Sequence, residues 1–269
     1  MLWENLTSEE FIDALKVTKG VAIIPMGCLE KHGYHMPLGT DMFIAKELAE
    51  KAAEIEPALV VPIHPYGIIS EAQHRAGCLS ITSQLQYQLL EELCDELARN
   101  GYHKIMIING HGGAKNFLRY FAQSRLEKPH DYVVYVIDAH FRHEYQTQAF
   151  LNEYGPMDGG GHADMIETSE IMYLHPDTVH MERLVQEQTY EDKQLNVLEE
   201  NGVFTGIWWY AKYPQHIAGN PYNSTAKKGE VINKIHVENI AKAIKVIKED
   251  DLSLKLQQEF YKKTKDPER

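Results

Sequence analysis

Two carboxylates and two imidazoles fall within residues 27–41, directly after an apolar run of the chain. Glu30 and His32 are two positions apart, so on an extended chain their side chains point the same way. A Pro/Gly turn can bring Asp41 back toward them. Oxygen and imidazole donors without regularly spaced thiolates suit Zn²⁺, Mn²⁺ or Fe²⁺ rather than a structural cysteine-type zinc site. A polar surface loop would explain this single segment equally well, since Glu, Lys and His are mostly exposed.

Two further clusters combine glycine with histidine and acid. His111 stands in the Asn-Gly-His-Gly-Gly segment 109–113, after the apolar run 104–108 and before a helical pattern. His162 follows three glycines, and Glu167 is expected about one and a half turns into the next helix. Glycines let the backbone turn sharply and approach a ligand closely. Three such clusters are hard to explain as solvated loops, so together they favour a metal site.

The composition narrows the classes of function. The chain has 269 residues, with 27 Lys and Arg against 39 Asp and Glu, which gives a net charge of −12 at pH 7. An acidic chain without a basic cluster argues against nucleic acid and anionic membrane surfaces as partners. Its first residues lack a basic segment followed by an apolar one, and no run approaches membrane-spanning length. We therefore expect a cytoplasmic protein.

The cysteines indicate a reducing environment. Cys28, Cys78 and Cys94 form no CxxC pair, and reduced thiols are the simplest interpretation. Cys28 is two residues from Glu30, which allows a ligand or nucleophile role. A small buried side chain beside the site is the favoured explanation.

Short apolar runs alternate along the chain with helical patterns. The runs predict buried strands at residues 21–25, 58–63, 104–108 and 132–137, and the helical patterns fall at 42–55, 85–98, 114–126 and 231–247. Continuous β-branched runs between amphipathic helices predict an α/β fold with a mainly parallel sheet, covered by helices on both faces. No linker divides residues 1–269, so we expect a single domain.

Two segments lack a clear period. Residues 186–228 contain Trp208, Trp209 and several Tyr, Gly and Pro residues. We interpret this segment as a loop-rich cover over the site, with contact between subunits as the competing role. The charged tail, residues 255–269, is expected to fray.

This layout places the clusters at one edge of the sheet. In open parallel α/β sheets, ligands bind beyond the carboxyl ends of the strands. Residues 30–41 follow the first strand and His111 follows the third, so they can converge there. The loop 65–77 follows the second strand and carries Ser70 and His74, which would supply a wall of the pocket.

These residues resemble the creatininase (creatinine amidohydrolase) family. The matching elements, in family order and spacing, are Glu30-x-His32-Gly33-x-His35-x-Pro37-x-x-Thr40-Asp41, Pro65-Tyr66-Gly67 with Ser70 and His74-x-x-Gly77, Asn109-Gly110-His111-Gly112-Gly113, and His162 followed by Glu167-Thr168-Ser169. The resemblance implies a three-layer α/β/α fold and a homohexamer. It also implies two divalent metal ions (Zn, Mn or Fe) that serve to hydrolyse a C–N bond, often in a cyclic amide.

The resemblance also implies roles for individual residues. Glu30 and His111 would hold one metal, His32 would hold the other, and Asp41 would bridge the two. His162 would lie near the substrate, where it is a candidate for proton transfer.

The chain departs from the family pattern at the second metal. Creatininase has a Tyr-Glu pair where this chain has Gly112 and Gly113, and many relatives have a glutamate where this chain has Met165. Glu167 is left as the carboxylate able to complete the site, and we assign it a catalytic role beside its role as a ligand. Asp164 is the weaker alternative.

Other histidines and acids compete for these roles. A further group after the fourth predicted strand, Asp138, His140, His143 and Glu144, could rival Glu167. His35 and His74 are second choices for proton transfer, with a structural role as an equal explanation.

The pocket residues bear on the substrate. Asp158 stands where creatininase presents an aromatic side chain, and Gly112 replaces a second one. We assign substrate binding to Ser70, His74, Gly112 and Asp158, and expect a polar amide or lactam with negligible action on creatinine. Trp208 or Trp209 could instead supply an aromatic wall.

Three functions follow from these residues. We favour a metal-dependent amidohydrolase that acts on a small polar molecule through a metal-activated water. The same centre could instead trim peptides or hydrolyse a carbocyclic ketone. The third alternative is a non-catalytic metal-binding scaffold subunit.

Overall fold

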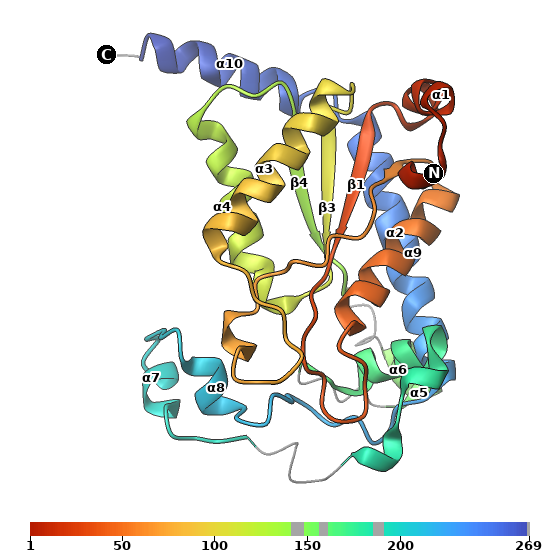
Figure 1. Ribbon diagram of the computed structural model, residues 1–269, viewed down its shortest axis with the longest axis vertical. Helices are drawn as coiled ribbons and strands as arrows, with labels where there is room; N and C mark the ends of the chain where they lie inside the picture. The colour runs from red at the N-terminus through yellow and green to blue at the C-terminus, as the bar shows by residue number, and fades with distance from the viewer. Residues whose placement is uncertain (141–147, 156–160, 185–190, 268–269) are drawn as a thin grey trace.

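Four parallel strands form one sheet in the computed structural model, which describes residues 1–140, 148–155, 161–184 and 191–267 (Figure 1). In the order β2-β1-β3-β4 they are Leu59–Val60, Val21–Met26, Lys104–Asn109 and Val133–Asp138. Met26 pairs with Asn109, and Asn109 with Asp138. Three neighbouring strands therefore end at the same level, and the loops that follow them begin side by side.

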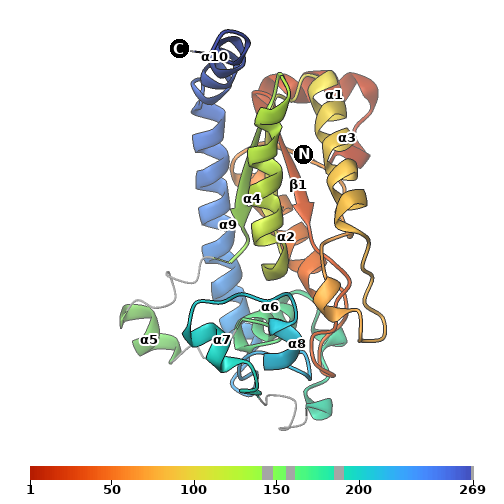
Figure 2. The ribbon, with the colours of Figure 1, turned by 90° about the vertical axis from the view of Figure 1, so that its left-hand side faces the viewer.

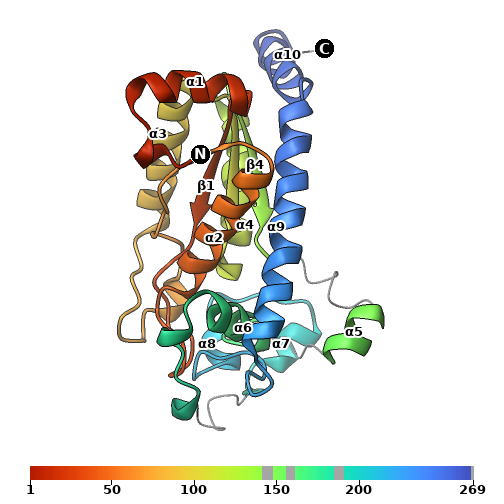
Figure 3. The ribbon, with the colours of Figure 1, turned by 90° about the vertical axis from the view of Figure 1, so that its right-hand side faces the viewer.

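Helices cover both faces of this sheet. The helices of the described residues are α1 Ser8–Thr18, α2 Thr40–Ile55, α3 Ser83–Arg99, α4 Lys115–Ser124, α5 Gln148–Tyr154, α6 Met165–Leu174, α7 Asn196–Glu200, α8 Trp208–Lys212, α9 Ala226–Glu249 and α10 Ser253–Lys265. Helices α3 and α4 lie on one face (Figure 2), and α2 and α9 lie on the other (Figure 3). The predicted three-layer α/β/α fold with a parallel sheet is confirmed.

Side chains that alternate between the two faces of the sheet divide the hydrophobic core into two clusters. Ile23 of β1 packs with Ile44 of α2 and Ile240 of α9, while the next residue, Ile24, packs with Leu90 of α3. Successive strand side chains point to opposite faces, so a strand buried on both faces must be apolar throughout. The continuous apolar runs of the sequence have this origin.

The structure extends or shortens several predicted elements. β2 covers only Leu59–Val60 of the predicted 58–63, and α2 begins two residues early, which puts Asp41 in its first turn. The structure places most of the tail that the sequence predicts to fray, residues 255–269, in α10, and the fraying itself stays a prediction. Tyr261 is buried there and its hydroxyl donates to the Arg125 carbonyl at 2.7 Å, so one aromatic anchor holds a largely charged helix.

The end of the molecule toward which the strands point is built by α6, α7 and α8, and α10 lies at the opposite end (Figures 1 and 3). Helix α6 packs against α9 and α2. None of the helices in the described part of the chain has the length and apolar character needed to cross a membrane.

The crossing of α6 and α9 depends on Gly229. A Cβ at this position would lie 2.5 Å from the Ser169 carbonyl carbon and closer still to its oxygen. In an exposed helix, alanine is more favourable than glycine by about 1 kcal/mol, but here the extra methyl group would push α6 away.

We expect Gly229→Ala to lower the free energy of unfolding by about 1–3 kcal/mol, as overpacking typically does. Urea denaturation measures this change. Gly206→Ala is the matched control, because a Cβ there meets nothing within 4 Å and the change should be nearly neutral. Equal stability of the Gly229→Ala variant and the parent chain would contradict the close crossing.

His35 ties the loop after β1 to α6. Its Nε2 lies 2.9 Å from the Thr168 hydroxyl, and the side chain is fully buried. Burial, with the charge of His32, lowers the pKa of His35 to about 4. Since the unfolded chain has an ordinary histidine pKa near 6.5, the unfolded state binds more protons between these values.

Stability should therefore fall as the pH drops from 7 to 4, with His35 contributing on the order of 3 kcal/mol to the change. Chemical denaturation at several pH values tests this against His35→Gln, which keeps a donor for Thr168 but does not titrate. The variant should lose less stability on acidification. If both proteins lose the same amount, His35 is not a neutral buried group.

Candidate metal centre

Metal-capable side chains converge beyond the carboxyl ends of β1 and β3. In each of three groups, the ligand-type atoms lie within 4.8 Å of one another: Cys28, Glu30, Asp41 and His111; Glu30, His32 and His162; and His32, Asp41 and Glu167. The five residues assigned as ligands from the sequence, Glu30, His32, Asp41, His111 and Glu167, each belong to at least one group. Glu30, His32 and Asp41 each belong to two, so the groups form one continuous cluster.

Asp41 lies between two imidazoles. Its Oδ1 is 3.1 Å from His32 Nε2, and its Oδ2 is 3.1 Å from His111 Nδ1. Glu30 Oε2 also faces His111 Nδ1, at 3.0 Å. The two oxygens of the Asp41 carboxylate thus face two separate sets of ligand-type atoms. This is the arrangement that a carboxylate shared by two cations requires.

Glu167 reaches the cluster from the first turn of α6, not from one and a half turns into the helix as the sequence suggested. Its Oε2 is 3.7 Å from His32 Nε2 and accepts a hydrogen bond from Ala163 N–H at 2.6 Å. Asp164, the weaker alternative, is instead the N-cap of α6 and accepts from Ile166 N–H and Glu167 N–H.

The rival group after β4 lies apart from this cluster. Asp138 pairs with Lys115 at 2.7 Å, and His140 Nε2 lies 3.4 Å from Glu170. Neither belongs to a metal-capable group among the described residues. His143 and Glu144 are outside the described residues.

The buried carboxylates of the cluster favour positive charge close to them. Burial by itself raises the pKa of Asp41, but His32 and His111 outweigh it and hold that pKa well below its usual range. Burial lowers the pKa of His32, yet Asp41, Glu167 and Glu30 raise it to about 10. The buried acids therefore demand positive charge. Without an ion, protonated imidazoles supply it.

The donor atoms fit a metal better than a proton network. Among the described residues, the buried Nε2 of His32 makes no well-aligned hydrogen bond, although a carboxylate oxygen lies 3.1 Å away. The lone pair of an imidazole and two carboxylates around one point match the nitrogen and oxygen preferences of Zn²⁺ and Mn²⁺. The residues present thus fit the ions that the sequence predicts.

His162 sits at the edge of the cluster, with its ring centre 4.2 Å from that of His32. Its Nε2 donates to the Lys31 carbonyl at 2.8 Å, which leaves Nδ1 as the nitrogen with a lone pair. Burial, with the charge of His32, lowers the pKa of His162 to about 3. The resting ring is neutral, so it can deliver a proton only after accepting one.

Cys28 lies beneath the cluster. Its Sγ is 3.0 Å from Asp41 Oδ2, and burial raises the pKa of the thiol well above its usual range. A protonated thiol donates to Asp41 and is no nucleophile. The contact nevertheless keeps it among the atoms that could hold a metal.

Sequence reasoning missed two contacts to the predicted ligands. The first is His216, whose Nε2 lies 2.7 Å from Glu30 Oε1. It comes from the segment 186–228, where no period or motif singles it out. The second is Glu71, whose Oε1 lies 3.5 Å from His111 Nε2. Its position in the loop 65–77, which was expected to form a wall of the pocket, could have indicated this contact.

Gly113 explains why Glu71 can take this position. A Cβ on Gly113 would lie 2.5 Å from His111 Nε2 and against the Glu71 carboxylate. The absence of a side chain at the position where creatininase has glutamate thus opens the space that His111 and Glu71 share.

A cavity of about 730 Å³ opens onto the cluster. Its lining comprises Glu30, Asp41, Ser70, Glu71, Gln73, His74, His111, Gly112, Gly113, Asn116, Gly161, His162, Glu167, Phe204, Gly206, Ile207, Trp208, Trp209 and Tyr210. Three of the four predicted substrate-binding residues are in this set, and the fourth, Asp158, lies outside the described residues. His35 is not in the set.

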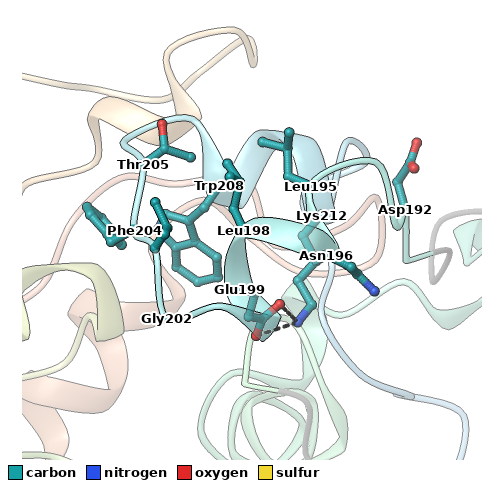
Figure 4. Close-up of a pocket in the computed structure, with 11 residues that line it drawn as sticks. Asp192, Leu195, Asn196, Leu198, Glu199, Gly202, Phe204, Thr205, Trp208 and Lys212 are labelled. Atoms are coloured by element: carbon teal, nitrogen blue, oxygen red, sulfur yellow. Dashed lines mark hydrogen bonds and ion pairs between the residues drawn. The ribbon is translucent and has the colours of Figure 1, made fainter.

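Residues 204 and 206–210 line one side of this cavity and supply several aromatic side chains. Trp208 and Trp209 of α8 meet edge to face, with ring centres 5.3 Å apart, and Trp209 stands at 90° to the His162 ring. A second cavity of about 340 Å³ shares Phe204 and Trp208 with the first (Figure 4). The Glu199–Lys212 ion pair, at 2.9 Å, lies at its edge.

Several known proteins are similar to this chain in sequence. Creatinine amidohydrolase from Pseudomonas putida is 25% identical, over 90% of this chain and 95% of that protein. 3-Dehydro-scyllo-inosose hydrolase from Thermotoga maritima is 26% identical, over 90% and 77%. Mycofactocin precursor peptide peptidase from Mycolicibacterium smegmatis is 28% identical, over 84% of each protein.

Solved structures share the fold. A crystal structure of creatinine amidohydrolase superposes with a TM-score of 0.74 at 24% identity, over 90% of this chain and 96% of that one. A manganese form of creatininase gives 0.73 at 25% identity, over 90% and 96%. The family model for creatinine amidohydrolase matches residues 4–244. Because this match spans nearly the whole chain, the protein belongs to the creatininase family.

Proposed function

We propose that this protein is a metal-dependent hydrolase that cleaves the C–N bond of an amide or cyclic amide in a small polar molecule. The observation that carries the proposal is Asp41, which directs one oxygen to His32 and the other to His111. A buried carboxylate with its two oxygens directed in this way is suited to bridge a pair of cations.

The cluster divides into two sets of ligands around Asp41. Glu30 and His111 would complete the first, and His32 and Glu167 would complete the second. Each set offers imidazole and carboxylate donors, which suit Zn²⁺, Mn²⁺ or Fe²⁺. Solved creatininase structures that include a manganese form and a zinc–zinc form of a mutant support this choice.

Two such ions, when bound, lower the pKa of a water molecule and polarise a carbonyl oxygen, which are the two tasks of amide hydrolysis. The protein must then move a proton to the leaving nitrogen. His162 is placed for this, because the Lys31 carbonyl fixes its Nε2–H and leaves Nδ1 able to accept a proton and pass it on. Glu167 is the second candidate, since burial raises its pKa to about 7.

The mouth of the cavity indicates the class of substrate. Ser70, Gln73, His74 and Asn116 offer hydrogen bonds, and Glu71 adds negative charge. These polar groups support a polar or donor-rich amide as substrate, held beside the aromatic wall of Trp208 and Trp209. The predicted contribution of Asp158 stays a prediction.

Assembly is a further proposal from the family resemblance, and location is a further proposal from the sequence itself. We infer a homohexamer in the cytoplasm, with a small molecule as substrate and neither nucleic acid nor membrane as a partner. The acidic composition, with a net charge of −12, supports the exclusion of polyanionic partners.

Metal stoichiometry tests the ligand assignment. We expect Asp41→Asn to lose both ions, because its carboxylate serves both sets, and Glu167→Gln to lose one. Elemental analysis of dialysed protein measures the content of each variant. Glu182→Gln is the control, since this acid is 70% exposed and belongs to no metal-capable group among the described residues. Retention of two ions per chain by Asp41→Asn would exclude the bridging role.

Steady-state assays of the metal-loaded protein test the reaction. We expect turnover of a polar cyclic amide and negligible turnover of creatinine. Creatinine hydrolysis at an ordinary enzymatic rate, of order 1 to 10³ per second, would contradict our interpretation of the pocket.

The same assay panel separates the alternatives. Release of a terminal residue from short peptides would favour peptide trimming, and ring opening of a carbocyclic ketone would favour the activity for which the Thermotoga maritima relative is named. A fully metal-loaded protein that hydrolyses none of these substrates would favour a scaffold role.

A further inference from the structure

We propose that His216 is a positioning residue for Glu30, and that Trp209 sets the tautomer of His216 that this task requires. The inference rests on the proposed role of Glu30 as a metal ligand. It assigns a function to the segment 186–228 beyond covering the site. It connects the aromatic wall of the cavity to the predicted metal centre through hydrogen bonds.

A chain of hydrogen bonds connects the wall to the cluster. Trp209 Nε1 donates to His216 Nδ1 at 2.9 Å, and His216 Nε2 lies 2.7 Å from Glu30 Oε1. The other Glu30 oxygen, Oε2, lies 3.0 Å from His111 Nδ1. His216 thus contacts the predicted ligand Glu30, from which it is separated by 186 positions in the chain.

The N–H of Trp209 determines which nitrogen of His216 carries the proton. An indole N–H can only donate, so His216 Nδ1 must accept and cannot carry a proton in this bond. The proton of His216 is therefore on Nε2, where it donates to Glu30 Oε1. Without the Trp209 N–H, the neutral ring could hold its proton on Nδ1 and would present a lone pair to a carboxylate.

This donation divides the two oxygens of Glu30 between two tasks. Oε1 accepts from His216, while Oε2 faces the side of the cluster where His111 and Asp41 lie. Contacts of this kind orient a ligand and commonly change metal affinity by about 10 to 100-fold when they are removed.

The backbone holds His216 in place for this contact. His216 is fully buried and has a φ of +62°, a left-handed conformation that residues other than glycine seldom adopt. Two residues later, Ala218 exchanges backbone hydrogen bonds with His162 at 2.9 and 3.1 Å. The Lys31 ammonium donates to the Gln215 carbonyl at 2.7 Å. The loop is thereby joined on both sides of His216 to the predicted site.

Three variants separate the two hydrogen bonds of His216. His216→Asn keeps an acceptor near Nδ1, tolerates the left-handed backbone, and cannot reach Glu30. His216→Gln places a donor near Nε2 and keeps the bond to Glu30. Trp209→Phe keeps an aromatic ring and removes the N–H together with part of the indole ring. Trp208→Phe is the matched control, because it is adjacent in α8 and makes no hydrogen bond through its side chain among the described residues.

The measurement is metal affinity, determined for each metal-free protein by competition with a chelating dye. We expect affinity to fall by about 10 to 100-fold in His216→Asn and by a smaller factor in Trp209→Phe. It should be largely restored in His216→Gln and unchanged in Trp208→Phe. The absorption spectrum of Co²⁺ bound to each variant gives a second readout, because a change in how Glu30 coordinates alters the bands.

The outcomes distinguish this inference from the proposed function. If Asp41→Asn abolishes metal binding while His216→Asn and Trp209→Phe keep parental affinity and Co²⁺ spectra, the positioning role is excluded and the metal centre stands. If Asp41→Asn binds metal as the parent does, the metal centre itself fails. Should His216→Asn not fold, Trp209→Phe decides, since parental affinity and spectrum in that variant would overturn the tautomer argument.

Discussion

The burial of several carboxylates around Asp41 is the constraint on which the rest of the structure depends. Unpaired buried charges are very costly, so acids at this depth must meet cations or protonated imidazoles. His32 and His111 lie 3.1 Å from the two Asp41 oxygens. The fold must therefore deliver the end of β1, the first turn of α2, the end of β3 and the start of α6 to one point. A parallel sheet meets this demand, because it brings the carboxyl ends of its strands together.

Rigid contacts outside the cluster keep these four elements in register. Gly229 lets α9 approach α6 closely, and the bond between His35 and Thr168 joins α6 to the loop after β1. Displacement of α6 would carry Glu167 with it, and His32 would lose one of its acids. The apolar core that holds α2 and α9 against the sheet thus also holds the geometry of the polar site.

The chain departs from the family pattern in the source of one carboxylate. Creatininase has a glutamate after the histidine of the 109–113 segment, where this chain has Gly113, and Glu71 lies in the space beside that glycine. Glu167 approaches His32 from α6. Trp208 and Trp209 line the cavity that opens onto these acids.

The sequence by itself determined the strands, the faces of the helices and the types of ligand, because period, glycine placement and motif spacing are local properties. Helix α1 was not predicted, although the capping box of Thr7 and Glu10 that begins it is a local signal of the same kind. Only the tertiary structure decided that Glu167 meets His32, that His216 holds Glu30, and that Tyr261 anchors α10. The physical reason is that these contacts join residues far apart in the chain. These contacts form only when the layers of the fold pack together, so no local sequence pattern predicts them.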